Sequence, residues 1–205
     1  MKRGTFRKKS YDEAIAQLSK KKRTTWIIRG HRAIKKPRQK KIKVHWKPPA
    51  WFMVIPLGSH GNNPIQKRLW KLTSDFVRIF DWELYGVCAS CGKKIQHWQD
   101  GDCGHYKAWS VCNNYFKFDK RNLALQCSNC NRLSDGSIGH NFGETLKKRR
   151  GDHILQSIEN HKYNLHGGKL ENIKLVQLAK EMVDTIHKEF TIKPDYYEKI
   201  IEKLE

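Results

Sequence analysis

Cys-Ala-Ser-Cys at positions 88–91 and Cys-Ser-Asn-Cys at positions 127–130 bracket the stretch of sequence that decides the fold. Two Cys-x-x-Cys pairs can bring four thiolates around one tetrahedral ion, which leaves no open position for water. One pair alone would also fit a redox site, but two pairs in a chain without signs of export indicate a metal. Of the remaining cysteines, Cys112 and Cys103 are expected to be free thiols, although Cys103 lies close to His105 and leaves a second ligand arrangement open. The predicted ligands of one structural zinc ion are Cys88, Cys91, Cys127 and Cys130.

Polar residues between and beside the cysteine pairs have the chemistry of a phosphodiester-cleaving metal site. Asp102 and Asn131 can offer oxygen atoms, which Mg²⁺ and Mn²⁺ prefer as ligands. His105 suits a general base for a water molecule, because the pKa of histidine lies near neutral pH. Taken alone, His105 would be interpreted as a structural histidine, but its register with Asp102, Asn122 and Asn131 favours a role in catalysis.

These residues can meet if the segment forms a hairpin followed by a helix. The expected strands are 95–106 and about 122–126, and the expected helix is 128–136. The two candidate metal ligands and the histidine then converge beside that helix. Asn122, which opens the second strand, could either hydrogen-bond the hairpin loop or fix the orientation of the histidine.

The charge of the chain indicates a nucleic acid as partner. Lys and Arg number 41 against 20 Asp and Glu, which gives a formal net charge of +21. Such a surface binds phosphates and releases counterions, although charge alone does not separate DNA from RNA. Residues 1–50 hold 18 of these cations against two acids. The candidates for phosphate contact are Lys35, Lys36, Arg38, Lys40, Lys41, Lys43, Lys147, Lys148, Arg149 and Arg150. For residues 147–150, the alternative interpretation is that the cations only form the solvent-exposed face of a helix.

Composition and periodicity also predict the organisation of the chain. Helices are expected over 64–85 and 170–190, where apolar residues recur at helical spacing, and after Pro194. No run approaches the roughly 18 apolar residues of a membrane helix, and the start of the chain lacks a secretory signal, so we expect a cytoplasmic protein. The predicted segments are a basic arm (1–50), a linker (51–66), a zinc-containing core (67–151) and C-terminal helices (152–205).

The segment from about Leu69 to Gly151 resembles the phage NinG (Rap) recombination nuclease family. The resemblance rests on the helix before the first cysteine pair, on the basic helix that ends in Gly151, and on four short motifs. These motifs are Cys-Ala-Ser-Cys-Gly at 88–92, Gly-His-Tyr at 104–106, Phe118 with Asn122, and Gln-Cys-Ser-Asn-Cys-Asn at 126–131. The combination of Asp-x-x-His with Cys-x-x-Cys-Asn is also similar to phage endonuclease VII, a Holliday-junction resolvase of the HNH superfamily.

The resemblance implies an α+β fold, in which a mostly helical chain surrounds a small, zinc-stapled ββα-metal core and carries a basic arm. It implies that Asp102 and Asn131 hold the catalytic Mg²⁺ or Mn²⁺, that His105 is the base, and that the cysteines hold zinc. Two positions depart from the commoner HNH pattern. Gly104 stands directly before the base, where many HNH enzymes have an acid, and Asn131 replaces the last histidine.

Three functions fit these observations. The first is a structure-selective DNA endonuclease that cuts branched recombination intermediates such as Holliday junctions or D-loops. Symmetric cutting of a four-way junction needs two active sites, so a homodimer is expected in that case. The second is a zinc-knuckle protein that binds DNA or RNA without catalysis, and the third is a general HNH nicking endonuclease.

Overall fold

The structure is a computed structural model that describes residues 26–29, 32–35, 46–110, 112, 116–132, 136–161 and 171–205. The chain divides into two units, residues 1–45 and 46–205. In the first unit, β1 (Trp26–Arg29) and β2 (Arg32–Lys35) form an antiparallel pair in which Trp26 lies opposite Lys35. The phosphate-contact candidates Lys36, Arg38, Lys40, Lys41 and Lys43 lie outside the described residues.

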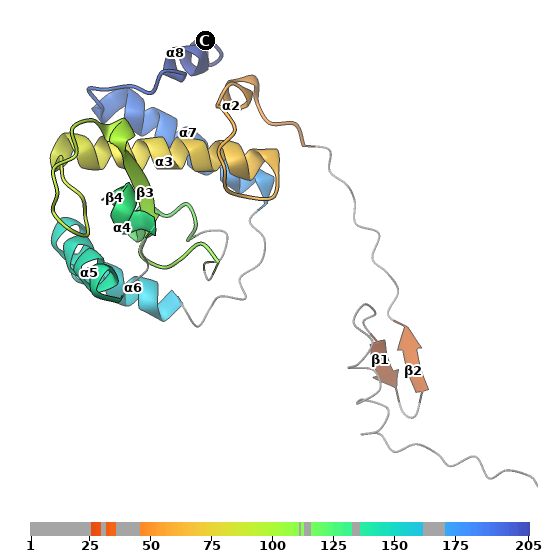
Figure 1. Cartoon of the computed structure of the whole chain (residues 1–205). Coiled ribbons are helices and arrows are strands. Elements are labelled where there is room, and N and C mark those ends of the chain that lie inside the picture. The colour runs from red at the N-terminus through yellow and green to blue at the C-terminus, as the bar shows by residue number, and fades with distance from the viewer. Residues whose placement is uncertain are drawn as a thin grey trace, which may run out of the picture. The chain divides into compact units, whose positions relative to one another are not determined.

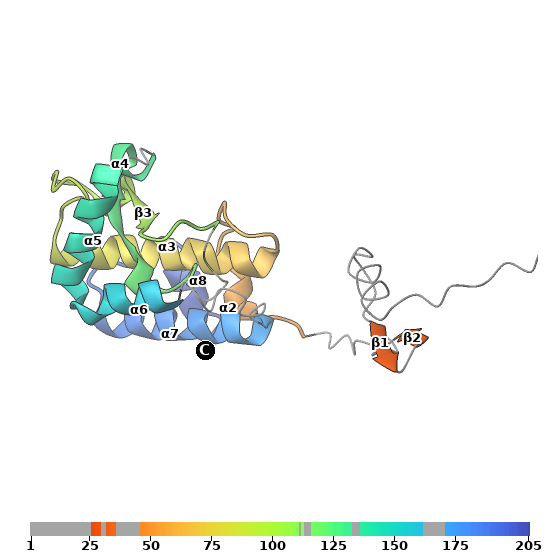
Figure 2. The ribbon, with the colours of Figure 1, turned by 90° about the horizontal axis from the view of Figure 1, so that it is seen from below.

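The second unit is built around α3 (Pro64–Leu84), the longest helix of the described part of the chain. The helix begins where the Asn63 side chain accepts a hydrogen bond from the backbone N–H of Gln66, 2.7 Å away, and Pro64 occupies the first turn. Figures 1 and 2 show α3 lying between α7 (Asn172–Glu189) and a short hairpin. The apolar spacing that predicted α3 and α7 therefore corresponds to their mutual packing.

The segment 51–66, predicted as a linker, contributes to this same core. It begins with α2 (Ala50–Met53), and the side chains of Trp51, Phe52 and Ile55 are buried. The C-terminal helix α8 (Tyr197–Ile201) contacts α2. Segments from both ends of the second unit thus pack into one hydrophobic core with α3.

The hairpin consists of β3 (Gly101–His105) and β4 (Leu123–Cys127), so the first strand is shorter than expected. Asp102 pairs with Gln126 and His105 with Leu123. A short 3-10 helix precedes each strand, and three helices lie between the hairpin and α7. The remaining elements are η1 (Trp98–Asp100), η2 (Lys120–Asn122), α4 (Ser128–Arg132), α5 (Gly136–Arg150) and α6 (His153–His161). The described fold is α+β and mostly helical, with two small two-stranded sheets.

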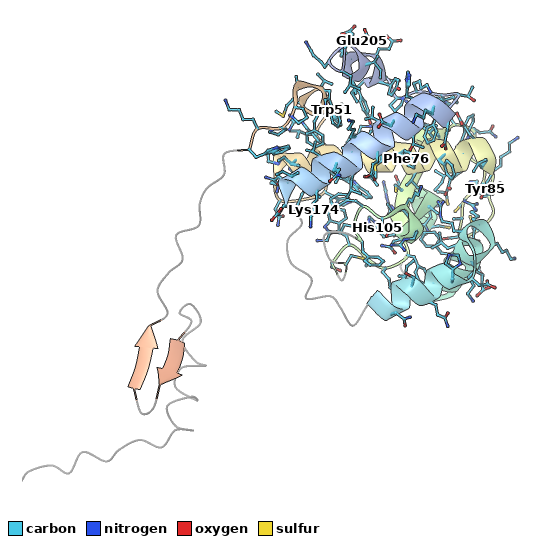
Figure 3. All side chains as sticks on the ribbon, turned by 180° about the vertical axis from the view of Figure 1, so that it is seen from behind. Trp51, Phe76, Tyr85, His105, Lys174 and Glu205 are labelled. Atoms are coloured by element: carbon cyan, nitrogen blue, oxygen red, sulfur yellow. The ribbon has the colours of Figure 1, made fainter. Side chains whose placement is uncertain are left out.

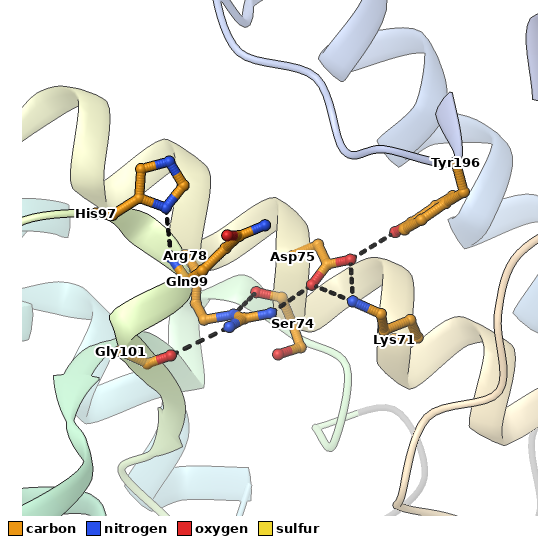
Figure 4. Close-up of polar contacts among 8 residues, drawn as sticks. All are labelled: Lys71, Ser74, Asp75, Arg78, His97, Gln99, Gly101 and Tyr196. Carbon is orange, nitrogen blue, oxygen red and sulfur yellow. Dashed lines mark hydrogen bonds and ion pairs between the residues drawn. The ribbon is translucent and has the colours of Figure 1, made fainter. Parts of the chain in front are cut away.

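A buried carboxylate, Asp75, ties three parts of the second unit together (Figure 4). Its oxygens accept hydrogen bonds from Lys71 Nζ at 2.7 Å, Arg78 Nη2 at 2.5 Å and Tyr196 Oη at 2.9 Å. Arg78 Nη1 also donates to the carbonyl of Gly101 at 3.1 Å, which fixes the start of β3. Burial, together with the Asp75 carboxylate, raises the pKa of Tyr196 well above its usual value, so this phenol remains a donor.

A second buried carboxylate, Asp81, corrects one prediction about the basic helix α5. Asp81 accepts hydrogen bonds from Arg149 Nη1 at 3.2 Å, from Arg150 Nη2 at 3.0 Å and from the backbone N–H of Leu125 at 2.9 Å. The side chains of Arg149 and Arg150 are only 7% and 11% exposed. They serve as internal partners of a buried acid rather than as a phosphate clamp, because a buried carboxylate must be paired.

The two lysines of this run have a different environment. Lys147 forms an ion pair with Glu144 at 2.8 Å, and Lys148 is exposed. Lys148 therefore keeps the surface position that a phosphate contact requires. Separately, none of the described helices is both long and apolar enough to cross a membrane.

Substituting Asp81 by alanine should destabilise the second unit by about 3–5 kcal/mol, because two arginines and one backbone N–H would lose their buried partner. The free energy of unfolding in a denaturant titration measures this loss. Asp184→Ala, which removes an exposed carboxylate from α7, is the control and should change stability by less than about 0.5 kcal/mol. Equal stability of the two variants would contradict a central role for Asp81.

Candidate functional site

The four predicted cysteine ligands converge, as the paired spacing indicated. The sulfur atoms of Cys88, Cys91, Cys127 and Cys130 all lie within 4.8 Å of one another. The Sγ atoms of Cys91 and Cys127 are 3.9 Å apart. Tetrahedral zinc with Zn–S bonds of about 2.3 Å requires sulfur atoms about 3.8 Å apart, so the cluster has the dimensions of a structural metal site such as zinc.

The electrostatics of the cluster also fit a cation. Burial raises the pKa of Cys88, but hydrogen bonds from the backbone N–H groups of Cys127, Cys91 and Ser90 outweigh burial and lower the pKa to about 7. Burial raises the pKa of Cys91 and of Cys130, and the neighbouring sulfurs raise that of Cys130 further. Four thiolates would repel one another here, and a divalent cation is what removes that repulsion.

Asp102 and Asn131, the candidate ligands of a catalytic ion, are brought together beside this cluster. Asn131 Nδ2 donates to Asp102 Oδ2 at 3.3 Å, which joins β3 to α4, the helix that carries Cys130. Both side chains reach solvent. A carboxylate and an amide in contact at the surface form a hard-oxygen pair, provided that the amide turns its oxygen toward the ion.

The structure explains why the position before the histidine is a glycine. A Cβ atom on Gly104 would lie 1.6 Å from Gln126 Oε1. The amide of Gln126 is held in this place because its Nε2 donates to Ser90 Oγ at 2.5 Å. No acid fits at position 104, so Asp102, two residues earlier on the same face of β3, is the acid of this strand.

His105 lies at the end of β3 (Figure 3). Its environment is aromatic. Its ring stacks on Trp70 of α3, with centroids 4.9 Å apart and an angle of 19°. His105 Nε2 lies 3.1 Å from the carbonyl oxygen of Lys117. Because a carbonyl only accepts, Nε2 carries the hydrogen, and the neutral ring has its lone pair on Nδ1. Burial lowers the pKa of His105 to about 4, so the ring is neutral at pH 7.

Asp102 and His105 leave β3 on opposite faces. Side chains alternate along a strand, so residue 102 shares its face with 104, and 105 shares its face with 103. Asp102 contacts Asn131, whereas His105 contacts Trp70. The expected convergence of His105 with the other two residues is thus not a direct contact. Within the described residues β3 pairs only with β4. A ligand that lay along the other edge of β3 could therefore contact side chains from both faces of the strand.

Asn122 is fully buried and holds the loop that follows β3. Its Oδ1 accepts from the backbone N–H of Lys107 at 2.7 Å, and its Nδ2 lies 3.2 Å from the carbonyl of Lys107 and 3.3 Å from that of Phe116. Of the two roles expected for Asn122, these contacts match the first, a hydrogen bond to the hairpin loop.

Sequence reasoning missed the residues that surround His105. Trp109 lies edge-on to His105 with centroids 5.5 Å apart, His60 stacks on Trp109, and Lys117 Nζ lies 5.0 Å from the Trp109 ring. No motif joins these positions, because they come from the loop before α3 and from the loop between β3 and β4. The aromatic residues themselves were the only available signal.

Comparison with known proteins places the chain in a family. A family model described as bacteriophage lambda NinG protein matches residues 3–189. The chain belongs to the NinG family. No curated protein and no solved structure matches the chain.

The NinG match spans nearly the whole chain. It includes the cysteine cluster, the Asp102–Asn131 pair and His105, and it extends over the basic arm, whereas α8 lies beyond its end. The wider relation to endonuclease VII and the HNH superfamily stays a hypothesis drawn from the motifs. The feature of this NinG chain that can be tested most directly is the four-cysteine cluster.

Replacing Cys127 by alanine should remove the bound zinc and unfold the core around β4 and α4, because the cluster holds the loop after α3 to both elements. Zinc content by atomic emission and a thermal melt measure the two effects. Cys112→Ala is the matched control, since Cys112 lies away from the cluster and donates to the carbonyl of Lys107. Full zinc content and an unchanged melt in Cys127→Ala would contradict the assignment.

Proposed function

We propose that this NinG-family chain is a metal-dependent endonuclease that cuts branched DNA intermediates of phage recombination, such as a Holliday junction or a D-loop. The observation that carries the proposal is the contact between Asp102 and Asn131 next to the four-cysteine cluster, on the strand that ends in His105. Family membership supports a function in phage recombination, and the net charge of +21 supports a nucleic acid as substrate.

Asp102 and Asn131 would hold the catalytic Mg²⁺ or Mn²⁺, while the four cysteines hold zinc as a scaffold. The catalytic ion would polarise the phosphate and stabilise the negative charge that develops in hydrolysis. Asp102 supplies the charged ligand and Asn131 a neutral oxygen. Two protein ligands leave room for water and phosphate oxygens, which is the coordination that Mg²⁺ favours.

His105 would take the proton from the attacking water. Its Nδ1 carries a lone pair, and the hydrogen bond from Nε2 to Lys117 fixes the ring. A phosphodiester along the unpaired edge of β3 would meet Asp102 from one face and His105 from the other. Attack in line with the leaving 3′-oxygen would give products with a 5′-phosphate and a 3′-hydroxyl.

Other parts of the chain would bind the rest of the substrate. The basic residues of the arm, from Lys35 to Lys43, and the exposed Lys148 at the end of α5 are the proposed phosphate contacts. Paired cuts across a four-way junction would require a homodimer.

A second candidate function is a zinc-knuckle protein that binds DNA or RNA without cutting it. The stacking of His105 on Trp70 supports this alternative, because a histidine with only a packing role would make the same contact. A general nicking endonuclease is a third candidate with the same site. Cleavage assays on substrates of different shape separate the three.

We expect purified wild-type protein with Mg²⁺ to cut a four-way junction faster than linear duplex or single-stranded DNA, and EDTA to stop the reaction. His105→Ala should bind the junction as wild type does but cut it at least about 100-fold more slowly, since the base is lost. Gel analysis of single-turnover reactions measures both. Equal nicking of all substrates would indicate a general nicking endonuclease. Binding of DNA by wild type without cleavage would contradict the endonuclease proposal.

The pH dependence of cleavage tests the state of His105. The base is active when neutral, and burial places its pKa at about 4, so protonation of His105 should not slow cleavage between pH 8 and 5.5. A histidine with the ordinary value of 6.5 would lose about tenfold by pH 5.5. Single-turnover rates across this range are the measurement, and an inflection near pH 6.5 would contradict a buried neutral base.

A further inference from the structure

Four rings form one cluster at the end of β3, and His60 is the member that faces solvent. Trp70 and Trp109 lie 5.2 Å apart, centroid to centroid, at an angle of 77°. His105 contacts both of them, at 4.9 and 5.5 Å. His60 also contacts both, at 5.1 Å from each. The two histidines therefore share the same pair of tryptophans, although they come from segments separated by the whole of α3.

The ring nitrogens of His60 are available for a ligand. His60 is exposed, and no described residue makes a hydrogen bond to its ring. Two other histidines differ in this respect, because His105 Nε2 is bonded to the carbonyl of Lys117 and His187 Nδ1 to the hydroxyl of Tyr197. The stacking on Trp109, at an angle of 29°, nevertheless restricts the plane of the His60 ring. His60 is thus a positioned but unused hydrogen-bond donor.

The surroundings of His60 favour an anion. Lys117 Nζ lies over the ring of Trp109, a member of the same cluster, at 5.0 Å from the ring centroid. Burial lowers the pKa of His60, so at pH 7 its ring is neutral and offers one N–H. His60 lies close enough to His105 to lower its pKa, in addition to the larger effect of burial. A phosphate attacked by a water molecule at His105 Nδ1 would therefore lie near the His60 ring and the Lys117 ammonium group.

We propose that His60 is a second histidine of the active site, which donates a hydrogen bond to the phosphodiester that is cleaved at His105. Lys117 is its companion, since its ammonium group would neutralise part of the phosphate charge. This assignment rests on the proposed function for the place of cleavage. It adds a substrate contact from the loop before α3, a segment without any of the zinc or metal-ligand motifs.

Three variants separate a chemical role of His60 from a packing role. His60→Phe keeps an aromatic ring against Trp70 and Trp109 but removes the N–H donor. His60→Gln removes the ring but restores a donor. His153→Phe, at the exposed start of α6, is the matched control for adding a phenyl group at the surface. Thermal melts should show all three variants folded, because His60 is not part of the buried core.

The experiment measures, for a four-way junction, the dissociation constant in Ca²⁺ and the single-turnover cleavage rate in Mg²⁺. We expect His60→Phe to lose about 10- to 100-fold in cleavage and to bind measurably more weakly, as the loss of a hydrogen bond to a charged group predicts. His60→Gln should recover part of both quantities. The control should match wild type.

The outcomes distinguish this inference from the proposed function. If wild type cuts the junction and His60→Phe binds and cuts it equally well, the role of His60 is refuted and the endonuclease stands. If wild type does not cut but His60→Phe still weakens binding relative to His153→Phe, the endonuclease proposal fails while the phosphate contact of His60 is supported. Binding by His60→Phe equal to that of the control refutes the contact in either case.

Discussion

The carboxylate of Asp81 is the constraint on which the arrangement of the second unit depends. A fully buried acid is tolerated only when donors surround it, and Asp81 has two arginines and a backbone N–H. These donors come from α5 and β4, whereas the acid comes from α3. The requirement to pair one charge therefore fixes a helix and a strand against α3 at the same time, with a directionality that hydrophobic packing alone does not provide.

Asp75, earlier on the same helix, extends this control to the start of β3. It holds Arg78, and Arg78 in turn holds the carbonyl of Gly101 where β3 begins. With Asp81 bonded to Leu125 in β4, both strands of the hairpin are attached to α3 through buried polar groups. The cysteine cluster holds the same end of the hairpin, because Cys127 pairs with Gly101. Asp102 and His105 thus lie on a hairpin that is held by Asp81, by Arg78 and by the cysteine cluster.

Local patterns in the sequence were sufficient for part of this architecture. The apolar spacing over 64–85 predicted α3 almost to the residue, and the spacing of the cysteines predicted their convergence. The partners of Arg149 and Arg150 were not predictable, because a run of cations looks the same whether its charges meet phosphate, water or a distant acid. The burial of Phe52 was missed for a similar reason. Its segment is short and flanked by turn residues, and its helix packs against α8, a contact that no local pattern shows.

The same limit applies to the candidate site, and Gly104 shows what the structure adds. In sequence, a glycine before the histidine is simply a missing acid, but in the structure Gln126 occupies the space that a side chain would need. The acid of the proposed site is then Asp102, on the face opposite to His105. A group that acts with both residues has to lie along the free edge of β3 rather than over either face. In the proposed reaction an extended phosphodiester strand would follow that edge, and the cluster of His60, Trp70 and Trp109 would meet it beside His105.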